Sequence, residues 1–144
     1  MQPLLTTSIR RSFHWGIVII ADADSGGKIP EVEPGKAVSS NEHGIIALVR
    51  HAQDIDSFEG EFEWAESQVT IRLLTEAELP YVDRSEVFRG RLSVANGRIT
   101  VGDADSDVEI PAHRGWNELI VTVAAGGLGD SAPDELRIDL IPSV

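Results

Sequence analysis

Apolar and polar residues alternate along most of this chain with a period of two residues, which is the period of a half-buried β-strand. Val69, Ile71 and Leu73 fall on one face of such a strand, whereas Thr70 and Arg72 fall on the other. No stretch of about ten or more residues shows the period of about 3.6 residues that marks an amphipathic helix. One strand or a pair of strands is expected in residues 9–21, and further strands are expected in residues 44–52, 58–64, 69–74, 88–94, 98–101, 108–110, 116–124 and 135–141.

These segments are short, and turns rich in Gly, Pro, Asp and Asn separate them. Such spacing is typical of a β-sandwich and not of an α/β protein. We therefore predict an all-β fold, an antiparallel β-sandwich of the jelly-roll kind with eight or nine short strands, in a single domain over residues 1–144.

Two of the expected strands differ in how they should be buried. Residues 17–21 are apolar on both faces, which is typical of a central strand that is covered on both sides. In the last strand, Leu136, Ile138 and Leu140 are expected to face the core, and Asp139 is expected to face outward.

The strongest turn signal is Asn96-Gly97, which lies between two alternating runs. A two-residue type I′ turn needs positive φ at both central positions, and Asn-Gly suits it best. The turn would pair Val94 with Ile99 and Leu92 with Val101, and all four side chains would then share one face. We therefore predict a β-hairpin over residues 88–101.

Charge and composition narrow the range of partners. The chain has 24 acidic and 12 basic residues and a net charge of −12. Nucleic acids and anionic membranes are therefore not expected as ligands, because both are bound through Lys and Arg. A basic protein or a cation is compatible with this charge.

The chain has no cysteine, which excludes disulfides and thiolate chemistry. The sequence shows neither a signal-peptide apolar run nor a membrane span, so a cytoplasmic location is expected.

The C-terminal half carries a resemblance. SEVF is followed by RLSVANGRITV, an acidic loop, VEIPAHRGWNELIVTVAA and finally DELRIDLIP. Over residues 69–142 this order of strands and turns resembles uncharacterised bacterial β-sandwich proteins. It is more distantly similar to the competence protein J family, inhibitors of a DNA-entry nuclease. The resemblance implies a sandwich fold, and it supplies no catalytic residues.

Two acidic loops have nearly the same sequence. The first contains Asp22 and Asp24, and the second contains Asp103, Asp105 and Asp107. Alternate carboxylates in a loop can surround a hard cation such as Ca²⁺, which takes six to eight oxygen ligands. Aspartates at such positions also stabilise turns through hydrogen bonds to the backbone. Both roles are open, and Ca²⁺ is the one cofactor that the sequence suggests.

A second acidic cluster is Glu59, Glu61 and Glu63, which alternate with apolar residues. The alternation predicts a half-buried strand with a strongly acidic outer face. This face is either solvated or a docking surface for a basic protein.

Three tryptophans, Trp15, Trp64 and Trp116, lie in different expected strands, so we predict that they pack in the core.

No signature of catalysis is present in the sequence. It has no Gly-x-Ser-x-Gly nucleophile motif and no phosphate-binding loop, and its four histidines lack the spacing of a metal site. We therefore predict a non-enzymatic protein-binding or inhibitor-type module with an acidic surface. The alternative is a cation- or carbohydrate-binding jelly roll that uses the aspartate loops. Sandwiches leave sheet edges that can pair, so a homodimer is compatible with either function.

Overall fold

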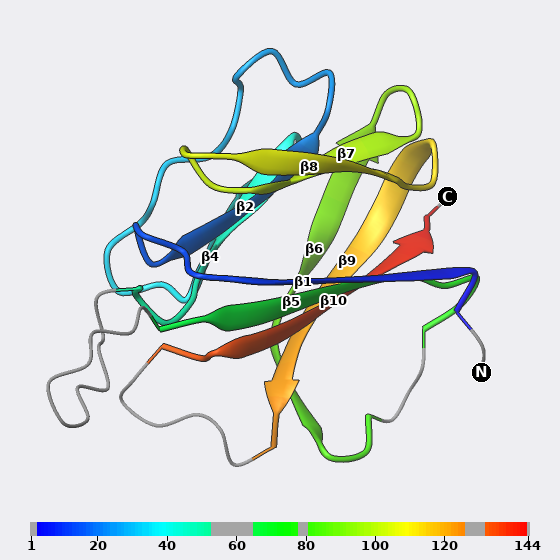
Figure 1. Cartoon of the computed structure of the whole chain (residues 1–144). Helices are drawn as coiled ribbons and strands as arrows, with labels where there is room; N and C mark the ends of the chain where they lie inside the picture. The colour runs from blue at the N-terminus through cyan, green and yellow to red at the C-terminus, as the bar shows by residue number, and fades with distance from the viewer. Residues whose placement is uncertain (1–2, 53–64, 78–80, 126–131, 144) are drawn as a thin grey trace, which may run out of the picture.

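The computed structural model describes residues 3–52, 65–77, 81–125 and 132–143, which form ten β-strands and no helix (Figure 1). The strands are β1 (Leu5–Arg11), β2 (Ile17–Asp22), β3 (Val38–Asn41), β4 (Gly44–Leu48), β5 (Ser67–Leu73), β6 (Arg84–Val94), β7 (Arg98–Gly102), β8 (Asp107–Pro111), β9 (Gly115–Ala124) and β10 (Glu135–Pro142). Since the described residues contain no helix, no helix among them could cross a membrane.

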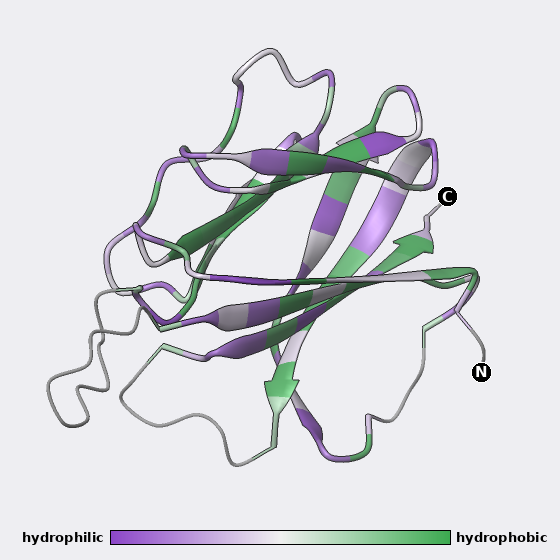
Figure 2. Cartoon of the chain, in the orientation of Figure 1, coloured by the Kyte–Doolittle hydropathy of each residue, from purple (hydrophilic) through white to green (hydrophobic). Residues whose placement is uncertain are grey.

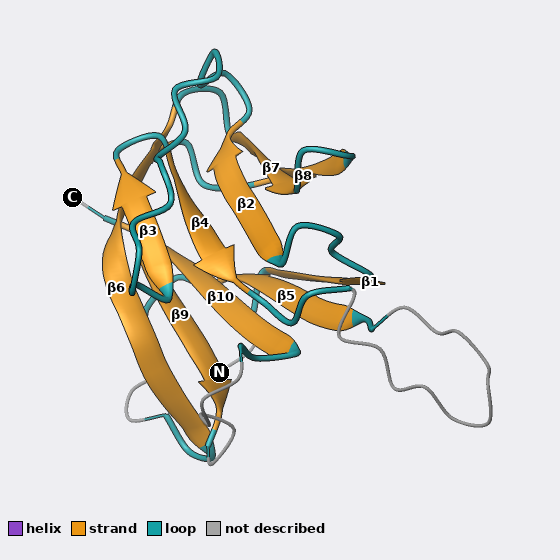
Figure 3. Cartoon of the chain, turned by 90° about the vertical axis from the view of Figure 1, so that its left-hand side faces the viewer, coloured by secondary structure: helices purple, strands orange, loops and turns teal. Residues whose placement is uncertain are grey.

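The strands form two five-stranded sheets (Figure 3). Sheet A has the order β1-β5-β10-β9-β6, and sheet B has the order β3-β4-β2-β7-β8. All neighbouring strands are antiparallel except β5 and β10, which are parallel. The predicted all-β sandwich is confirmed, with β3 as a strand that the alternation did not indicate.

The alternating side chains of the two sheets meet in one core. Inward residues of β5, β9 and β10 pack against inward residues of β2, β4 and β7. On β2, Val18 and Ile20 are fully buried, and on β5 Val69 and Ile71 are at most 1% exposed. β2 is coloured hydrophobic along most of its length, as expected from its sequence IVIIAD (Figure 2). The inward faces predicted for β5 and β10 are therefore confirmed.

The predicted hairpin over residues 88–101 is wrong. β6 pairs with β9 in sheet A, whereas β7 pairs with β2 and β8 in sheet B. Asn96-Gly97 therefore joins the two sheets. Gly97 has a φ of +70°, but Asn96 does not have a positive φ, so the turn is not type I′. Leu92, Val94, Ile99 and Val101 do share the core, but they enter it from opposite sides.

Asp139 does not face solvent. It lies on the outer face of sheet A, where the connection after β5 covers it. Its side chain is 1% exposed and forms a two-point ion pair with Arg72, with Nε–Oδ1 and Nη2–Oδ2 distances of 2.7 and 2.8 Å. The Tyr81 hydroxyl donates a hydrogen bond of 2.9 Å to Asp139 Oδ2. Burial first, and then the hydrogen bond to Asp139, raise the pKa of Tyr81.

Two of the tryptophans also depart from the core that was predicted for them. Trp15, in the turn between β1 and β2, is 62% exposed, and Trp116 at the start of β9 is 39% exposed. The guanidinium of Arg91 lies 4.7 Å from the centre of the Trp116 ring, in a cation–π contact. Trp64 lies outside the described residues. Isolated tryptophans at strand ends cannot be assigned to the core from alternation alone, because the neighbouring loops decide what covers them.

Candidate functional site

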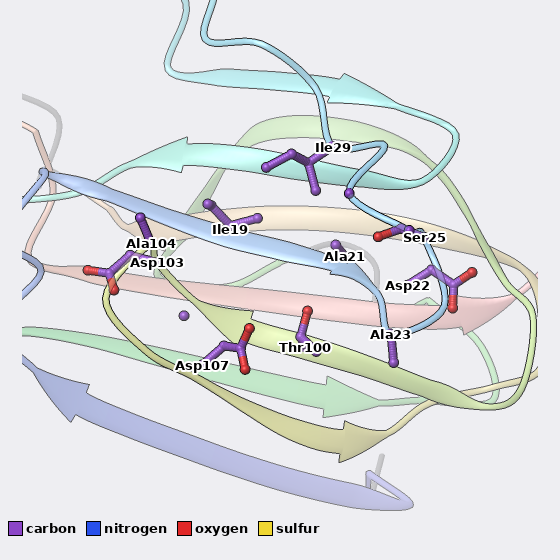
Figure 4. Close-up of a pocket in the computed structure, with 13 residues that line it drawn as sticks. Ile19, Ala21, Asp22, Ala23, Ser25, Ile29, Thr100, Asp103, Ala104 and Asp107 are labelled. Carbon is purple, nitrogen blue, oxygen red and sulfur yellow. The ribbon is translucent and has the colours of Figure 1, made fainter.

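The two aspartate loops flank neighbouring strands of sheet B. Asp22 ends β2, and Asp103 directly follows β7. The two strands are antiparallel, with Ile19 opposite Gly102 and Asp22 opposite Ile99. The loops therefore lie at opposite ends of the β2–β7 ladder, and Figure 4 shows Asp22 and Asp103 at opposite ends of the space between them.

That space is a groove of about 420 Å³ on the outer face of sheet B. Because Val18, Ile20, Ile99 and Val101 point into the core, alternation turns Ile19 and Ala21 of β2 and Thr100 and Gly102 of β7 to this outer face. Together these four residues form the floor of the groove, which we call the sheet B groove.

The loop after β2 covers one side of the sheet B groove. In Figure 4 the Ile29 side chain lies over that of Ile19. The Asn41 side-chain amide donates a hydrogen bond of 3.1 Å to the Lys28 carbonyl, which ties this loop to β3. The apolar outer face of residues 17–21 was the sequence signal for this groove. The sequence predicts cover on both faces of these residues, whereas the loop covers the outer face only in part.

Asp103 is a structural residue as well as a lining residue. Arg11 Nη2 donates to its Oδ1 at 2.6 Å, and the backbone amides of Asp105 and Ser106 donate to the same oxygen at 3.0 and 3.3 Å. Arg11 also donates to the Ser106 carbonyl at 2.9 Å, so this cluster fastens the end of β1 to the second acidic loop. Asp103 is 7% exposed, and its Oδ2 is buried with no hydrogen-bond partner among the residues described.

The first acidic loop is fastened to the turn between β6 and β7. Asp22 accepts hydrogen bonds from the backbone amides of Asp24 at 3.2 Å and Ala95 at 3.3 Å. Asp24 accepts a hydrogen bond of 2.7 Å from the Asn96 side-chain amide, and its other oxygen lies 3.6 Å from Arg98. These contacts explain the acid-rich sequence of the loop as turn chemistry.

Asp107 differs from Asp22 and Asp103. It is exposed on the edge strand β8, opposite Gly102, and its carboxylate forms no ion pair or hydrogen bond with any described residue. A Cβ at Gly102 would overlap the Ser106 carbonyl oxygen and would lie 2.5 Å from Asp107 Cα. A glycine at this position therefore allows the second acidic loop to fold close against β7 and to hold Asp107 at the rim.

The charge of the sheet B groove has one sign. Asp22, Asp103 and Asp107 line it, and its lining includes no Lys, Arg or His. Carboxylates in a partly apolar hollow favour cations and repel anions, because the field of like charges is focused there.

The two loops do not form one metal site. Asp22 and Asp24 lie at one end of the groove, and Asp103, Asp105 and Asp107 lie at the other. Within the described residues no three His, Asp or Glu side chains are grouped closely enough to hold a metal ion. Calcium binding by these aspartates stays the alternative that the sequence leaves open.

Glu59, Glu61 and Glu63 lie outside the described residues, so the predicted acidic strand stays a prediction.

The outer face of sheet A carries a different balance of charge. Arg72 on β5 pairs with Asp139, and Arg84 on β6 pairs with Glu135 at 2.9 Å. Arg89 on β6 lies 2.6 Å from Glu86 and 2.8 Å from Glu118. Acid and base are matched on this face, whereas in the sheet B groove Asp103 is paired with Arg11 and Asp107 has no described ion-pair partner.

The similarity of this chain to known proteins lies in its fold. No protein-family model matches the chain, and no curated protein matches its sequence. Its structure is similar to that of ComJ from Bacillus subtilis, described as an inhibitor of the DNA-degrading activity of NucA. The TM-score is 0.61 at 13% identity, over 99% of this chain and 98% of ComJ. It is also similar to the protein described as crocagin biosynthetic gene J, with a TM-score of 0.53 at 11% identity over 96% of both chains.

These similarities place the chain in a class of β-sandwich proteins that share one fold along their whole length. At such identities they establish the fold alone, and no residue of either protein is carried over to this chain.

Proposed function

We propose that this protein is a non-enzymatic binding module of the inhibitor type, and that its partner is a basic protein. The observation that carries the proposal is the acidic lining of the sheet B groove, which contains three aspartates and no Lys, Arg or His and keeps Asp107 exposed without a described ion-pair partner. Together with the net charge of −12, this lining favours a basic surface on that side of the sandwich.

A nuclease is the class of partner that fits best. Enzymes that bind DNA neutralise its phosphates with Lys and Arg, so an acidic protein can occupy the same basic surface. ComJ, with its similar fold, is described as an inhibitor of a DNA-degrading activity. The similarity supports a nuclease as the first partner to test.

The test is capture followed by inhibition. The full chain is immobilised, extract of the source organism is applied at low salt, and bound protein is released with a salt gradient. We expect a basic protein whose DNA-degrading activity is lost when the free chain is added back in equimolar amount. A column loaded at high salt is the control, because salt screens this association. If nothing is retained in stoichiometric amount, or if the released nuclease stays active, the proposal is wrong.

A further inference from the structure

We infer that the sheet B groove receives a short basic segment of the partner, a lysine side chain flanked by aliphatic residues. This inference rests on the proposed function and names the surface through which it would act. It is argued from the shape of the groove, its apolar floor and the charge at its rim.

The size of the groove fits a few side chains. Its volume of about 420 Å³ lies in the lower part of the range of small-ligand pockets. Its floor is Ile19, Ala21, Thr100 and Gly102, and Ile29 overhangs it while remaining 38% exposed. An aliphatic segment placed here would cover apolar surface that now faces water, and this favours binding in proportion to the area removed from water.

The Asp107 carboxylate at the edge of the sheet B groove favours a positively charged occupant. Asp107 is exposed and has no described partner, so it is available as a counter-charge. Asp103 lies at the same end, but its Oδ1 is paired with Arg11 at 2.6 Å and its Oδ2 is buried, so Asp107 is the carboxylate that would meet the ammonium group. Lysine fits this arrangement because its four-carbon stem packs on apolar surface while its ammonium group stays at the polar rim. An acidic segment would meet the exposed Asp107 carboxylate, and the lining of the groove offers it no Lys, Arg or His.

The direct test uses two tripeptide probes, acetyl-Leu-Lys-Leu-amide and acetyl-Leu-Gln-Leu-amide. Each is titrated into the ¹⁵N-labelled full chain and followed by the backbone amide signals. We expect the lysine probe to shift the signals of Ile19, Ala21, Ile29 and Thr100 with a Kd on the order of 1 mM, and the glutamine probe to bind more weakly. If the lysine probe shifts none of these signals, or if the glutamine probe binds equally well, the inference is overturned.

Two variants separate the rim charge from the net charge. Asp107→Asn removes the exposed rim carboxylate, and Glu76→Gln removes one exposed carboxylate from the connection after β5, which covers the opposite face of the sandwich. We expect Asp107→Asn to weaken the lysine probe about two- to fivefold, as for an exposed ion pair, and Glu76→Gln to leave its Kd unchanged. Equal effects of the two variants would overturn the rim assignment, because only net charge would then matter.

Charge reversal distinguishes this inference from the proposed function. Asp107→Lys and Glu76→Lys are each compared with the unaltered chain for binding to the captured nuclease. We expect Asp107→Lys to weaken binding about tenfold and Glu76→Lys to change it little. If Asp107→Lys binds the nuclease normally, the groove inference fails and the proposed function stands. If no nuclease is captured but the lysine probe still binds the groove, the proposed function fails and the groove inference stands.

Discussion

Replacing Asp139 by asparagine tests whether the outer face of sheet A is a true second core. The substitution keeps the shape of the side chain and removes its charge. Arg72 is 11% exposed and directs two nitrogens at the Asp139 carboxylate, so the variant would take the Asp139 charge away from a largely buried guanidinium.

The expected cost follows from that burial. Breaking a buried ion pair by removing one partner costs about 3–5 kcal/mol, because the remaining charge stays desolvated. The asparagine keeps an oxygen that can accept hydrogen bonds from Arg72 and Tyr81. We therefore expect the free energy of unfolding to fall by about 3 kcal/mol, near the lower end of that range. A domain of this size is stable by about 5–15 kcal/mol, so the variant should fold but should unfold at clearly lower urea concentration.

The assay is urea unfolding followed by circular dichroism. The Arg72→Met variant and the double variant are measured in the same way and complete a double-mutant cycle. We expect the two single losses to be strongly non-additive, since the double variant removes both charges of the Arg72–Asp139 ion pair together. A loss below about 1 kcal/mol for Asp139→Asn, or additivity within about 0.5 kcal/mol, would refute the reasoning.

Three further outcomes are expected. Because the folded state raises the pKa of Tyr81 above its ordinary value of 10, its contribution to stability is complete below pH 10 and is lost as the pH rises above 10. The Tyr81→Phe variant should therefore lose less stability at alkaline pH. Phenolate absorbance reports the ionisation of Tyr81 directly, because it is the only tyrosine in the chain. If the Tyr81 hydroxyl titrates near pH 10, as an exposed tyrosine does, the expected burial of this side chain is contradicted. Gly102→Ala should destabilise the fold by about 1–3 kcal/mol in urea, because the added methyl group meets backbone of the second acidic loop; an unchanged midpoint would show that the loop yields freely. Millimolar Ca²⁺ should leave the melting temperature unchanged, because Asp22 and Asp103 already accept hydrogen bonds from the chain itself. A rise in melting temperature that Asp24→Ala or Asp105→Ala abolishes would instead establish the predicted cation site.

The candidate site was only partly visible in the sequence. The paired aspartate loops were recognised, and both of them border the sheet B groove. Ile19 and Thr100 were not singled out, although the outward apolar face of residues 17–21 was a signal for them. Ile29 could not have been placed, because it reaches the groove from a loop whose course depends on contacts with β3.

Alternation in the sequence by itself determined that this chain forms strands and which side chains enter its core. A strand turns successive side chains to opposite faces, so the inward positions of β5, β9 and β10 follow from local backbone geometry. Only the tertiary structure decided which strands are neighbours. Asn96-Gly97 offered a local hairpin, but the chain places β6 and β7 in different sheets, because each strand finds its partners among segments far away in sequence. The same distant contacts bury Asp139 beneath a connection and bring two loops to the ends of one groove.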